Sequence, residues 1–266
     1  MSGVHTWRRW EPLFESFTWP AALRMAAVAE VGAGQRVLDV GCGIGDPTLQ
    51  VAVLVGPHGR VVGVDIDEGL VAIARERAAL LGLAHAEFHV LDVTTAELPE
   101  NAYHAVLARW SLADLDDVPL VLAKLRRALV PAGRIAVTAW APPDANPWLA
   151  VPLEAVAGRR PVRVLDPVHR GPFHLSADGA LARVLVQVGF QQVDQERFPL
   201  SLAAPGTDAY WELVSEMTGP LGPLLAALEP QARDQVRRSV GAALERFRTP
   251  EGVRIPAQAQ LAWGRA

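Results

Sequence analysis

The feature that most constrains the fold is the stretch at residues 35–55, which reads QRVLDVGCGIGDPTLQVAVLV. It begins with a short apolar run rich in β-branched residues, which predicts a buried strand. Three glycines follow at alternate positions, and such a run lets the backbone turn sharply and lets a ligand lie against main-chain atoms. Asp46 and Pro47 then predict a helix start with the aspartate as N-cap. A strand, a glycine turn and a helix predict the nucleotide-binding corner of a doubly wound α/β sheet.

The glycine spacing narrows the class of ligand. A dinucleotide site has the pattern G-x-G-x-x-G, which would place the third glycine at position 46. This chain has Asp46 there, and its third glycine is Gly45. A capping carboxylate competes for the amides and the positive helix dipole that a pyrophosphate would use. The spacing therefore counts against NAD and FAD and favours an adenosine ligand without phosphates.

The run LDVGCGIG at residues 38–45 resembles motif I of the class I S-adenosylmethionine-dependent methyltransferases. It is most similar to the branch that includes the ubiquinone and menaquinone methylases. The resemblance implies a seven-stranded, doubly wound Rossmann-like α/β sheet, mostly parallel with an antiparallel last strand, and a helical lid. It also implies that Asp39 helps to hold the amino group of S-adenosylmethionine. The residues of the glycine loop that would lie against the methionine part of this cofactor are Gly41, Cys42, Gly43 and Gly45.

Acidic residues follow the next two predicted strands. Asp65 ends the strand 60–65, about 20 residues after the glycines, where a nucleotide-binding unit places the carboxylate that binds the ribose hydroxyls. Asp67 is the rival, and we prefer Asp65 because Asp67 can cap the next helix. The strand 86–91 ends before Asp92 and Val93. The resemblance implies that Asp92 accepts from the adenine amine and that the Val93 backbone meets a ring nitrogen.

The fourth predicted strand, 103–109, leads to the same edge of the sheet. Ligands of open α/β sheets lie outside the carboxyl ends of the strands, so residues there are candidates to contact them. Ile66, Ala108 and Arg109 complete the predicted cofactor residues. In the resembling family a histidine often follows this strand, whereas this chain has leucine, alanine and aspartate at 112–114. We therefore expect that any base the family supplies there is absent.

Aromatic residues are concentrated near the N-terminus. Trp7, Trp10, Phe14 and Phe17 are spaced to lie on one face of a helix. Such a helix can simply dock on the core, or it can also roof the active site, where aromatic faces attract a sulfonium cation. Both interpretations stay open. The predicted substrate-binding residues are Trp10, Trp19, Trp110, Trp148 and Phe173.

Two histidines are candidates for a catalytic base. His174 is the first, because it lies in a proline-rich segment that can cover a pocket, and His5, near the aromatic residues, is the second. A general base of near-neutral pKa would help an acceptor with an acidic proton. For each histidine, an ordinary place in the core or on the surface is the alternative.

Changes in composition divide the chain into four predicted parts. Residues 1–34 form an N-terminal helical cap, and residues 35–140 form the cofactor-binding core. Residues 141–175, rich in proline, cover the substrate. Residues 176–266 complete the sheet and carry an inserted helical lid at about 207–247.

Length and charge exclude several classes of function. The 266 residues, 50% of them hydrophobic, fit one large α/β domain with a lid. A net charge of −4 argues against a nucleic-acid partner. Cys42 is the single cysteine, so no internal disulfide or multi-cysteine metal site is possible, and we expect no metal. Because we find no spanning segment and no secretory signal, we expect a cytoplasmic protein without membrane insertion, as a monomer or homodimer.

These observations predict methyl transfer from S-adenosylmethionine to a small, largely apolar acceptor, possessing aromatic or polyketide-like character, by in-line displacement. One alternative is an enzyme that binds the same cofactor and uses its charge to steer a cyclisation or rearrangement. An NAD-dependent oxidoreductase is a further alternative. The missing glycine at position 46 argues against it, as does the absence of a tyrosine four residues before Lys124.

Overall fold

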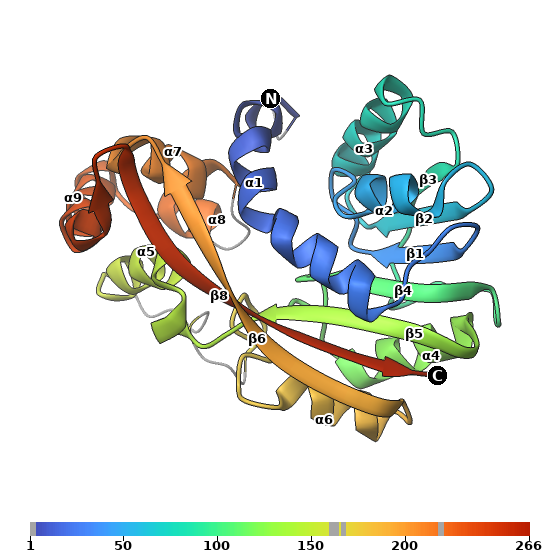
Figure 1. Cartoon of the computed structure of the whole chain (residues 1–266). Helices are drawn as coiled ribbons and strands as arrows, with labels where there is room; N and C mark the ends of the chain where they lie inside the picture. Colours follow the sequence, from blue (N-terminus) through green and yellow to red (C-terminus); the bar gives the residue numbers. More distant parts are fainter. Residues whose placement is uncertain (1–3, 160–164, 166–168, 218–220) are drawn as a thin grey trace.

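The computed structural model describes residues 4–159, 165, 169–217 and 221–266, apart from the side chains of residues 4–8, 11 and 217. Its centre is a twisted sheet with strand order β3-β2-β1-β4-β5-β8-β6 (Figure 1). The strands are β1 (Arg36–Val40), β2 (Arg60–Asp65), β3 (Ala86–Val90), β4 (Tyr103–Arg109), β5 (Leu129–Trp140), β6 (Gln191–Ala204), β7 (Arg248–Thr249) and β8 (Gly252–Arg265). Strands β1 to β5 pair in parallel, and β8 is antiparallel to both β5 and β6. The predicted fold class is confirmed, although the described sheet has eight strands instead of seven because the short β7 pairs with β8.

Helices cover both faces of this sheet. They are α1 (Val4–Val28), α2 (Thr48–Val55), α3 (Glu68–Leu80), α4 (Val118–Ala128), α5 (Pro147–Ala157), α6 (Ala180–Gln187), α7 (Thr207–Met217), α8 (Leu221–Ala226) and α9 (Pro230–Leu244), with 3-10 turns η1 (Pro143–Ala145) and η2 (Glu245–Phe247). Because successive side chains of a strand point to opposite faces of the sheet, neighbouring residues of β1 pack against different helices. Val37 packs with α1, α2 and α3, whereas Leu38 packs with α4 and α6.

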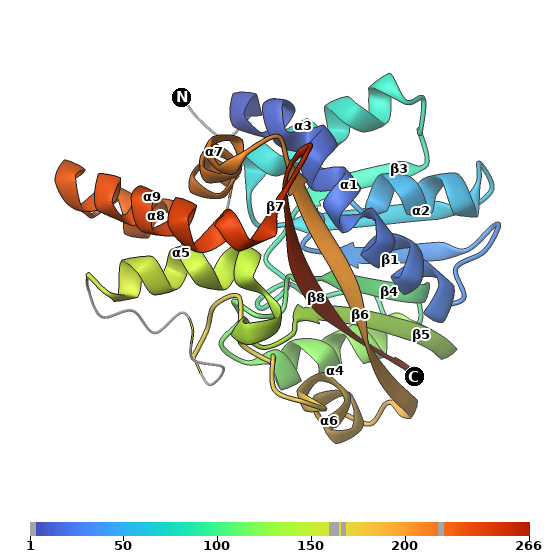
Figure 2. The same cartoon turned by 60° about the vertical axis from the view of Figure 1, so that its left-hand side comes forward.

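A separate apolar cluster joins the sheet to the lid. Strand β5 pairs with residues 259–265 of β8, so the first half of β8 continues beyond it, paired with the second half of β6. This two-stranded extension carries α7, α8 and α9, which lie beside α5 at one end of the molecule (Figures 1 and 2). Rings from α1 pack into the same cluster. The lid is therefore anchored by the sheet itself and by the N-terminal helix.

The predicted N-cap at Asp46 is wrong. Helix α2 begins at Thr48, and no side chain caps it. The Asp46 carboxylate instead accepts from Gln50 Nε2 at 2.7 Å and pairs with Arg77 of α3 at 3.2 Å. The guanidinium comes from a distant segment, and local sequence does not reveal such a partner. A capping carboxylate at Asp46 therefore no longer argues against a pyrophosphate ligand, whereas the glycine spacing still does.

Other differences concern element boundaries. The N-terminal segment is one continuous helix, α1, although Pro12 and Pro20 lie inside it. The part predicted to begin at residue 176 starts with an irregular stretch, and its first helix, α6, begins at Ala180. Residues 147–157 form α5, which the proline content did not indicate; Pro147 stands in its first turn, where its missing N–H leaves no bond unmade. Among the described residues we find no helix whose length and apolarity would let it cross a membrane.

Candidate functional site

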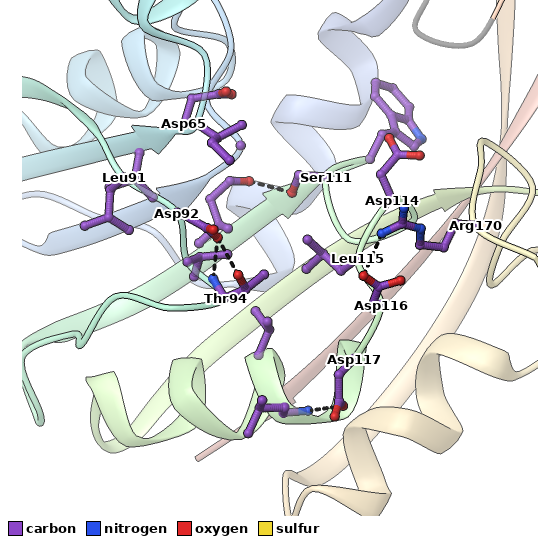
Figure 3. Close-up of a pocket in the computed structure, with 18 of the residues that line it drawn as sticks. Asp65, Leu91, Asp92, Thr94, Ser111, Asp114, Leu115, Asp116, Asp117 and Arg170 are labelled. Atoms are coloured by element: carbon purple, nitrogen blue, oxygen red, sulfur yellow. Dashed lines mark hydrogen bonds and ion pairs between the residues drawn. The ribbon is translucent and has the colours of Figure 1, made fainter.

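A cavity of about 710 Å³ opens at the carboxyl ends of β1, β2 and β4 (Figure 3). This is the point where the strand order reverses, and open α/β sheets bind ligands at such a point. Of the residues predicted from the sequence, those that line the cavity are Gly41, Asp65, Ile66, Asp92, Val93, Arg109 and Trp110.

Asp65 is held at the cavity by the backbone. Its Oδ2 accepts from the amide of Gly43 at 2.9 Å, and its Oδ1 accepts from the amide of Asp67 at 3.0 Å. Asp67 caps α3 by accepting from the amide of Leu70 at 3.0 Å, as predicted. The structure thus brings Asp65 to the cavity and places Asp67 at the helix start.

The next wall of the cavity is the turn after β3. Asp92 accepts from Thr94 Oγ1 at 2.6 Å and from its amide at 2.8 Å, and these hydrogen bonds lower the pKa of Asp92. Lys124, from α4, donates to the carbonyls of Val93 and Thr94, both at 3.0 Å. Sequence reasoning missed Lys124, whose only signal was that it is the single lysine of the chain.

Asp39 is buried and only partly satisfied. Its Oδ2 accepts from Thr48 Oγ1 at 2.5 Å, whereas its Oδ1 has no hydrogen-bond partner in the part of the chain that the structure describes. Burial raises the pKa of the Asp39 carboxyl to about 6. A buried acceptor without a partner is uncommon and indicates a group that a ligand can satisfy.

Arg109 supplies the opposite charge. Its Nη2 donates to the carbonyl of Asp46 at 2.7 Å, while its buried Nε has no partner among the described residues. Burial lowers the pKa of Arg109, and the charge of Asp39 opposes that change. A carboxylate and a guanidinium that influence each other across the glycine loop are complementary to an amino-acid zwitterion. The donor set therefore fits the methionine end of S-adenosylmethionine.

Cys42 does not face the cavity as predicted. Its side chain is buried, and a Cβ added at Gly63 of β2 would lie 2.9 Å from the Cys42 Cβ. The Cys42 amide donates to the carbonyl of Val64 at 3.0 Å, which ties the loop to β2 and turns the side chain into the core. Burial also raises the pKa of the thiol. Ala108 is likewise fully buried in the core.

The three glycines serve different purposes. A Cβ at Gly41 would meet the Cβ of Ser111 at 2.2 Å, so the glycine allows the loop after β4 to approach. A Cβ at Gly45 would meet Leu49 at 3.0 Å, within the start of α2. Only Gly43 has open space, with no heavy atom within 4 Å of its Cβ position. Of the three, Gly41 lines the cavity, and Gly43 leaves open space beside the loop.

Four rings, Phe17, Trp110, Trp140 and Trp148, form what we call the aromatic cluster. Trp110 stacks on Trp140 with centroids 4.3 Å apart, and Phe17 lies parallel to Trp140 at 5.8 Å. Trp148 meets Trp140 edge to face at 4.9 Å. Trp110 also lines the cavity, so this residue connects the cavity to the aromatic cluster. Within the described residues, the indole N–H groups of Trp110 and Trp148 are buried and lack acceptors.

The other predicted substrate residues are placed differently. Trp10 donates from Nε1 to Glu216 at 2.7 Å and fastens α1 to α7. Phe173 is fully buried in the apolar cluster that joins the sheet to α7, α8 and α9. Trp19 is 39% exposed on α1, and the structure does not bring it to the aromatic cluster.

Of the two candidate histidines, the structure describes the side chain of His174 alone. The Nδ1 of His174 lies 3.0 Å from the carbonyl of Ala113, and His174 does not belong to the cavity lining. His5 is in the first turn of α1, and its side chain falls outside the described residues. In the described ranges, no group of three or more His, Cys, Asp or Glu side chains is arranged to hold a metal ion.

Comparison with known proteins gives a consistent result. A family model described as "Methyltransferase domain" matches residues 32–154. The chain is 34% identical over 222 residues to nocamycin O-methyltransferase of Saccharothrix syringae, which covers 74% of this chain and 78% of that enzyme. It is 36% identical over 124 residues to aklanonic acid methyltransferase DauC of a Streptomyces species, covering 47% of this chain and 56% of the relative. The crystal structure of the [4+2]-cyclase SpnF shares the fold, with a TM-score of 0.57 at 21% identity, over 92% of this chain and 80% of that one.

Proposed function

Since this chain belongs to the class I S-adenosylmethionine-dependent methyltransferases, we propose that it methylates a small, largely apolar acceptor of aromatic or polyketide-like character. The observation that carries the acceptor class is the position of Trp110, which lines the cavity with one part of its surface and stacks on Trp140. Aromatic rings at this boundary favour a flat, apolar acceptor. The names of the two relatives, which act on nocamycin and aklanonic acid compounds, support the same class.

We assign the cofactor contacts from the cavity outward. Asp65 accepts the ribose hydroxyls, since a carboxylate has free lone pairs beyond the two amides that it already binds. Asp92, Val93 and Ile66 surround the adenine. Asp39 accepts from the amino group, and Arg109 donates to the carboxylate of the methionine part. The last two roles would satisfy Asp39 Oδ1 and Arg109 Nε, two buried polar atoms that have no partner among the described residues.

When bound, S-adenosylmethionine supplies a methyl group that is already electrophilic because it is attached to a sulfonium. The protein therefore has to align the acceptor behind that methyl group and exclude water. Trp110 is placed to do both, because it borders the cavity and is held by the ring of Trp140. The indole N–H of Trp110, which lacks a partner among the described residues, can donate to an oxygen of the methyl acceptor.

The first test is calorimetric titration of the protein, freed of co-purified ligand, with S-adenosylmethionine, S-adenosylhomocysteine and NAD. We expect binding of the first two and none of NAD. The second test is incubation with S-adenosylmethionine and three flat hydroxylated aromatics: 1-naphthol, 2-hydroxy-1,4-naphthoquinone and 1,8-dihydroxyanthraquinone. A product heavier by one methylene group supports the proposal. No heavier product from any of them would contradict the proposed acceptor class, and a product of unchanged mass would favour cyclisation or rearrangement.

A further inference from the structure

The loop after β4 supplies a carboxylate to the cavity at the position where the sequence predicted that a base would be absent. Asp114 lines the cavity together with Trp110 and Ser111, which come from the same loop. In Figure 3 it lies on the opposite side of the view from Asp65, which we assign to the ribose. Asp114 therefore belongs to the part of the cavity next to the aromatic cluster.

Asp114 differs from the other aspartates of the cavity in its hydrogen bonding. Asp65 and Asp92 accept hydrogen bonds as described above, Asp116 pairs with Arg170 at 2.8 Å, and Asp117 caps α4 by accepting from the amide of Leu120 at 2.9 Å. Among the residues that the structure describes, none donates a hydrogen bond to the carboxylate of Asp114. Its oxygens are therefore available to a ligand.

The surroundings of Asp114 favour proton transfer. Partial burial raises the pKa of the Asp114 carboxyl, and the charges of Arg170 and His174 oppose this change. Asp116 on its own loop is neutralised by Arg170. A carboxylate with a raised pKa is a stronger base. Asp114 is also exposed at the rim, so it can exchange its proton with water.

His174 contacts the backbone of the loop that carries Asp114. Its Nδ1 is 3.0 Å from the carbonyl of Ala113, the residue before Asp114. With hydrogen on Nδ1, the ring donates to this carbonyl and holds the loop in place. His174 is therefore a positioning residue in this scheme, in place of the catalytic role that the sequence suggested.

We propose that Asp114 is the general base that removes the proton from a phenol or enol acceptor during methyl transfer. The inference rests on the proposed function. The new bond forms between the acceptor oxygen and the methyl carbon while the carbon–sulfur bond breaks, and its electron pair stays on sulfur. The hydroxyl proton passes to the Asp114 carboxylate and then to solvent. The substrate class is thus narrowed to hydroxyl acceptors that are not ionised at neutral pH.

The test compares two acceptors in the wild type, in Asp114→Asn and in a control, Asp194→Asn, which alters an exposed aspartate on β6. The hydroxyl of 1-naphthol is neutral at pH 7, whereas that of 2-hydroxy-1,4-naphthoquinone is ionised and needs no base. With 1-naphthol we expect Asp114→Asn to lower kcat by about 100-fold or more, the usual contribution of a general base. With the naphthoquinone we expect less than about a fivefold loss, because no proton remains to be removed. The control should match the wild type on both.

Two further readouts separate the base from a structural role. Calorimetry should give the same S-adenosylhomocysteine affinity for Asp114→Asn as for the wild type. The kcat of the wild type on 1-naphthol should fall as the pH drops below the pKa of Asp114, because the protonated carboxyl cannot accept a proton. The kcat of Asp114→Asn should not show this decrease at low pH.

Each contrary outcome has a separate meaning. If the wild type methylates 1-naphthol and Asp114→Asn keeps kcat within about tenfold, below the range expected of a general base, Asp114 is not the base and the proposed function stands. An equal loss with both acceptors overturns the assignment too, since Asp114 would then only position the acceptor. If the wild type methylates neither probe, the proposed acceptor class is wrong and the role of Asp114 falls with it.

Discussion

The strand-end cavity and the aromatic cluster beside it are held in place by different forces. Around the cavity, Asp65 and Asp92 are fixed by hydrogen bonds from residues only two positions along the chain or from the neighbouring glycine loop. The aromatic cluster has almost no polar contacts, and its rings come from α1, the end of β4, the end of β5 and α5. One region is organised locally by the backbone, and the other by apolar packing between distant segments.

This difference explains why the two regions can change independently. A carboxylate that is fixed by amides keeps its direction as long as the strand end is intact. A stacked ring keeps its direction only while each packed neighbour stays in place. We therefore expect substitutions in the aromatic cluster to alter folding stability and acceptor use, and substitutions at the cavity to alter cofactor affinity.

The largest effect is expected for Trp140→Ala, which removes the ring at the centre of the aromatic cluster. Trp140 is only 6% exposed, and large-to-small changes of such residues lower the free energy of unfolding by about 3–5 kcal/mol. Urea unfolding measures this loss. Affinity for S-adenosylhomocysteine, measured on folded protein, should stay within about threefold, or less than 1 kcal/mol. A large loss of affinity would show that the two regions are coupled.

Asp65→Ala should weaken S-adenosylhomocysteine binding about 100-fold, or roughly 3 kcal/mol, because the ribose loses a charged acceptor. Calorimetry measures the affinity. The matched control is Asp67→Ala, which removes the cap of α3 and lowers the free energy of unfolding by about 1 kcal/mol. The control should keep the affinity of the wild type. If Asp67→Ala loses it instead, the ribose assignment is wrong.

Asp39→Asn should affect affinity and stability in opposite directions. Folding raises the pKa of Asp39 to about 6, so the native state binds more protons than the unfolded state between the two pKa values, and stability falls as pH rises through that window. At pH 7 asparagine avoids the buried charge, and we expect the free energy of unfolding of the ligand-free protein to rise by about 1–3 kcal/mol. Near pH 4 the two proteins should unfold alike.

The same variant should bind S-adenosylhomocysteine at least about tenfold more weakly, since the amino group loses its charged acceptor. Thermal unfolding with and without ligand, across pH, measures both effects. A ligand-free variant less stable than the wild type at pH 7 would contradict the sign of the argument.

Lys124→Met is expected to have a smaller effect. It removes two hydrogen bonds to the carbonyls after β3 and leaves the aliphatic part of the side chain. Affinity for S-adenosylhomocysteine should fall about fivefold, close to 1 kcal/mol for a loosened turn. Calorimetry with the nucleoside adenosine should show a loss of similar size, because the turn borders the adenine. An unchanged affinity for both ligands would mean that the turn holds its shape without Lys124.

The smallest effect is expected for Trp19→Ser, although the sequence placed Trp19 among the substrate-binding residues. Trp19 is 39% exposed, and surface changes usually alter stability by less than about 0.5 kcal/mol. The free energy of unfolding and kcat on 1-naphthol should both match the wild type. A raised KM for 1-naphthol would show that Trp19 contacts the substrate after all.

Much of the cofactor half could be predicted from the sequence. The strands 60–65 and 103–109 have the predicted bounds, and Asp67 caps α3 as expected. The preference for Asp65 over Asp67 also agrees with the placement of Asp65 in the cavity. These features depend on alternation within a strand and on caps within one helical turn, which a few neighbouring residues decide.

Only the tertiary structure decided how the remaining side chains point. It turned Cys42 into the core, paired Asp46 with Arg77, and placed Asp114 in the cavity. It also stacked Trp110 on Trp140, from two different strand ends. The direction of a loop side chain and the pairing of two rings depend on contacts between segments far apart in the chain. The sequence by itself therefore determined the strand framework and the cofactor class, and packing between distant segments determined which side chains line the cavity.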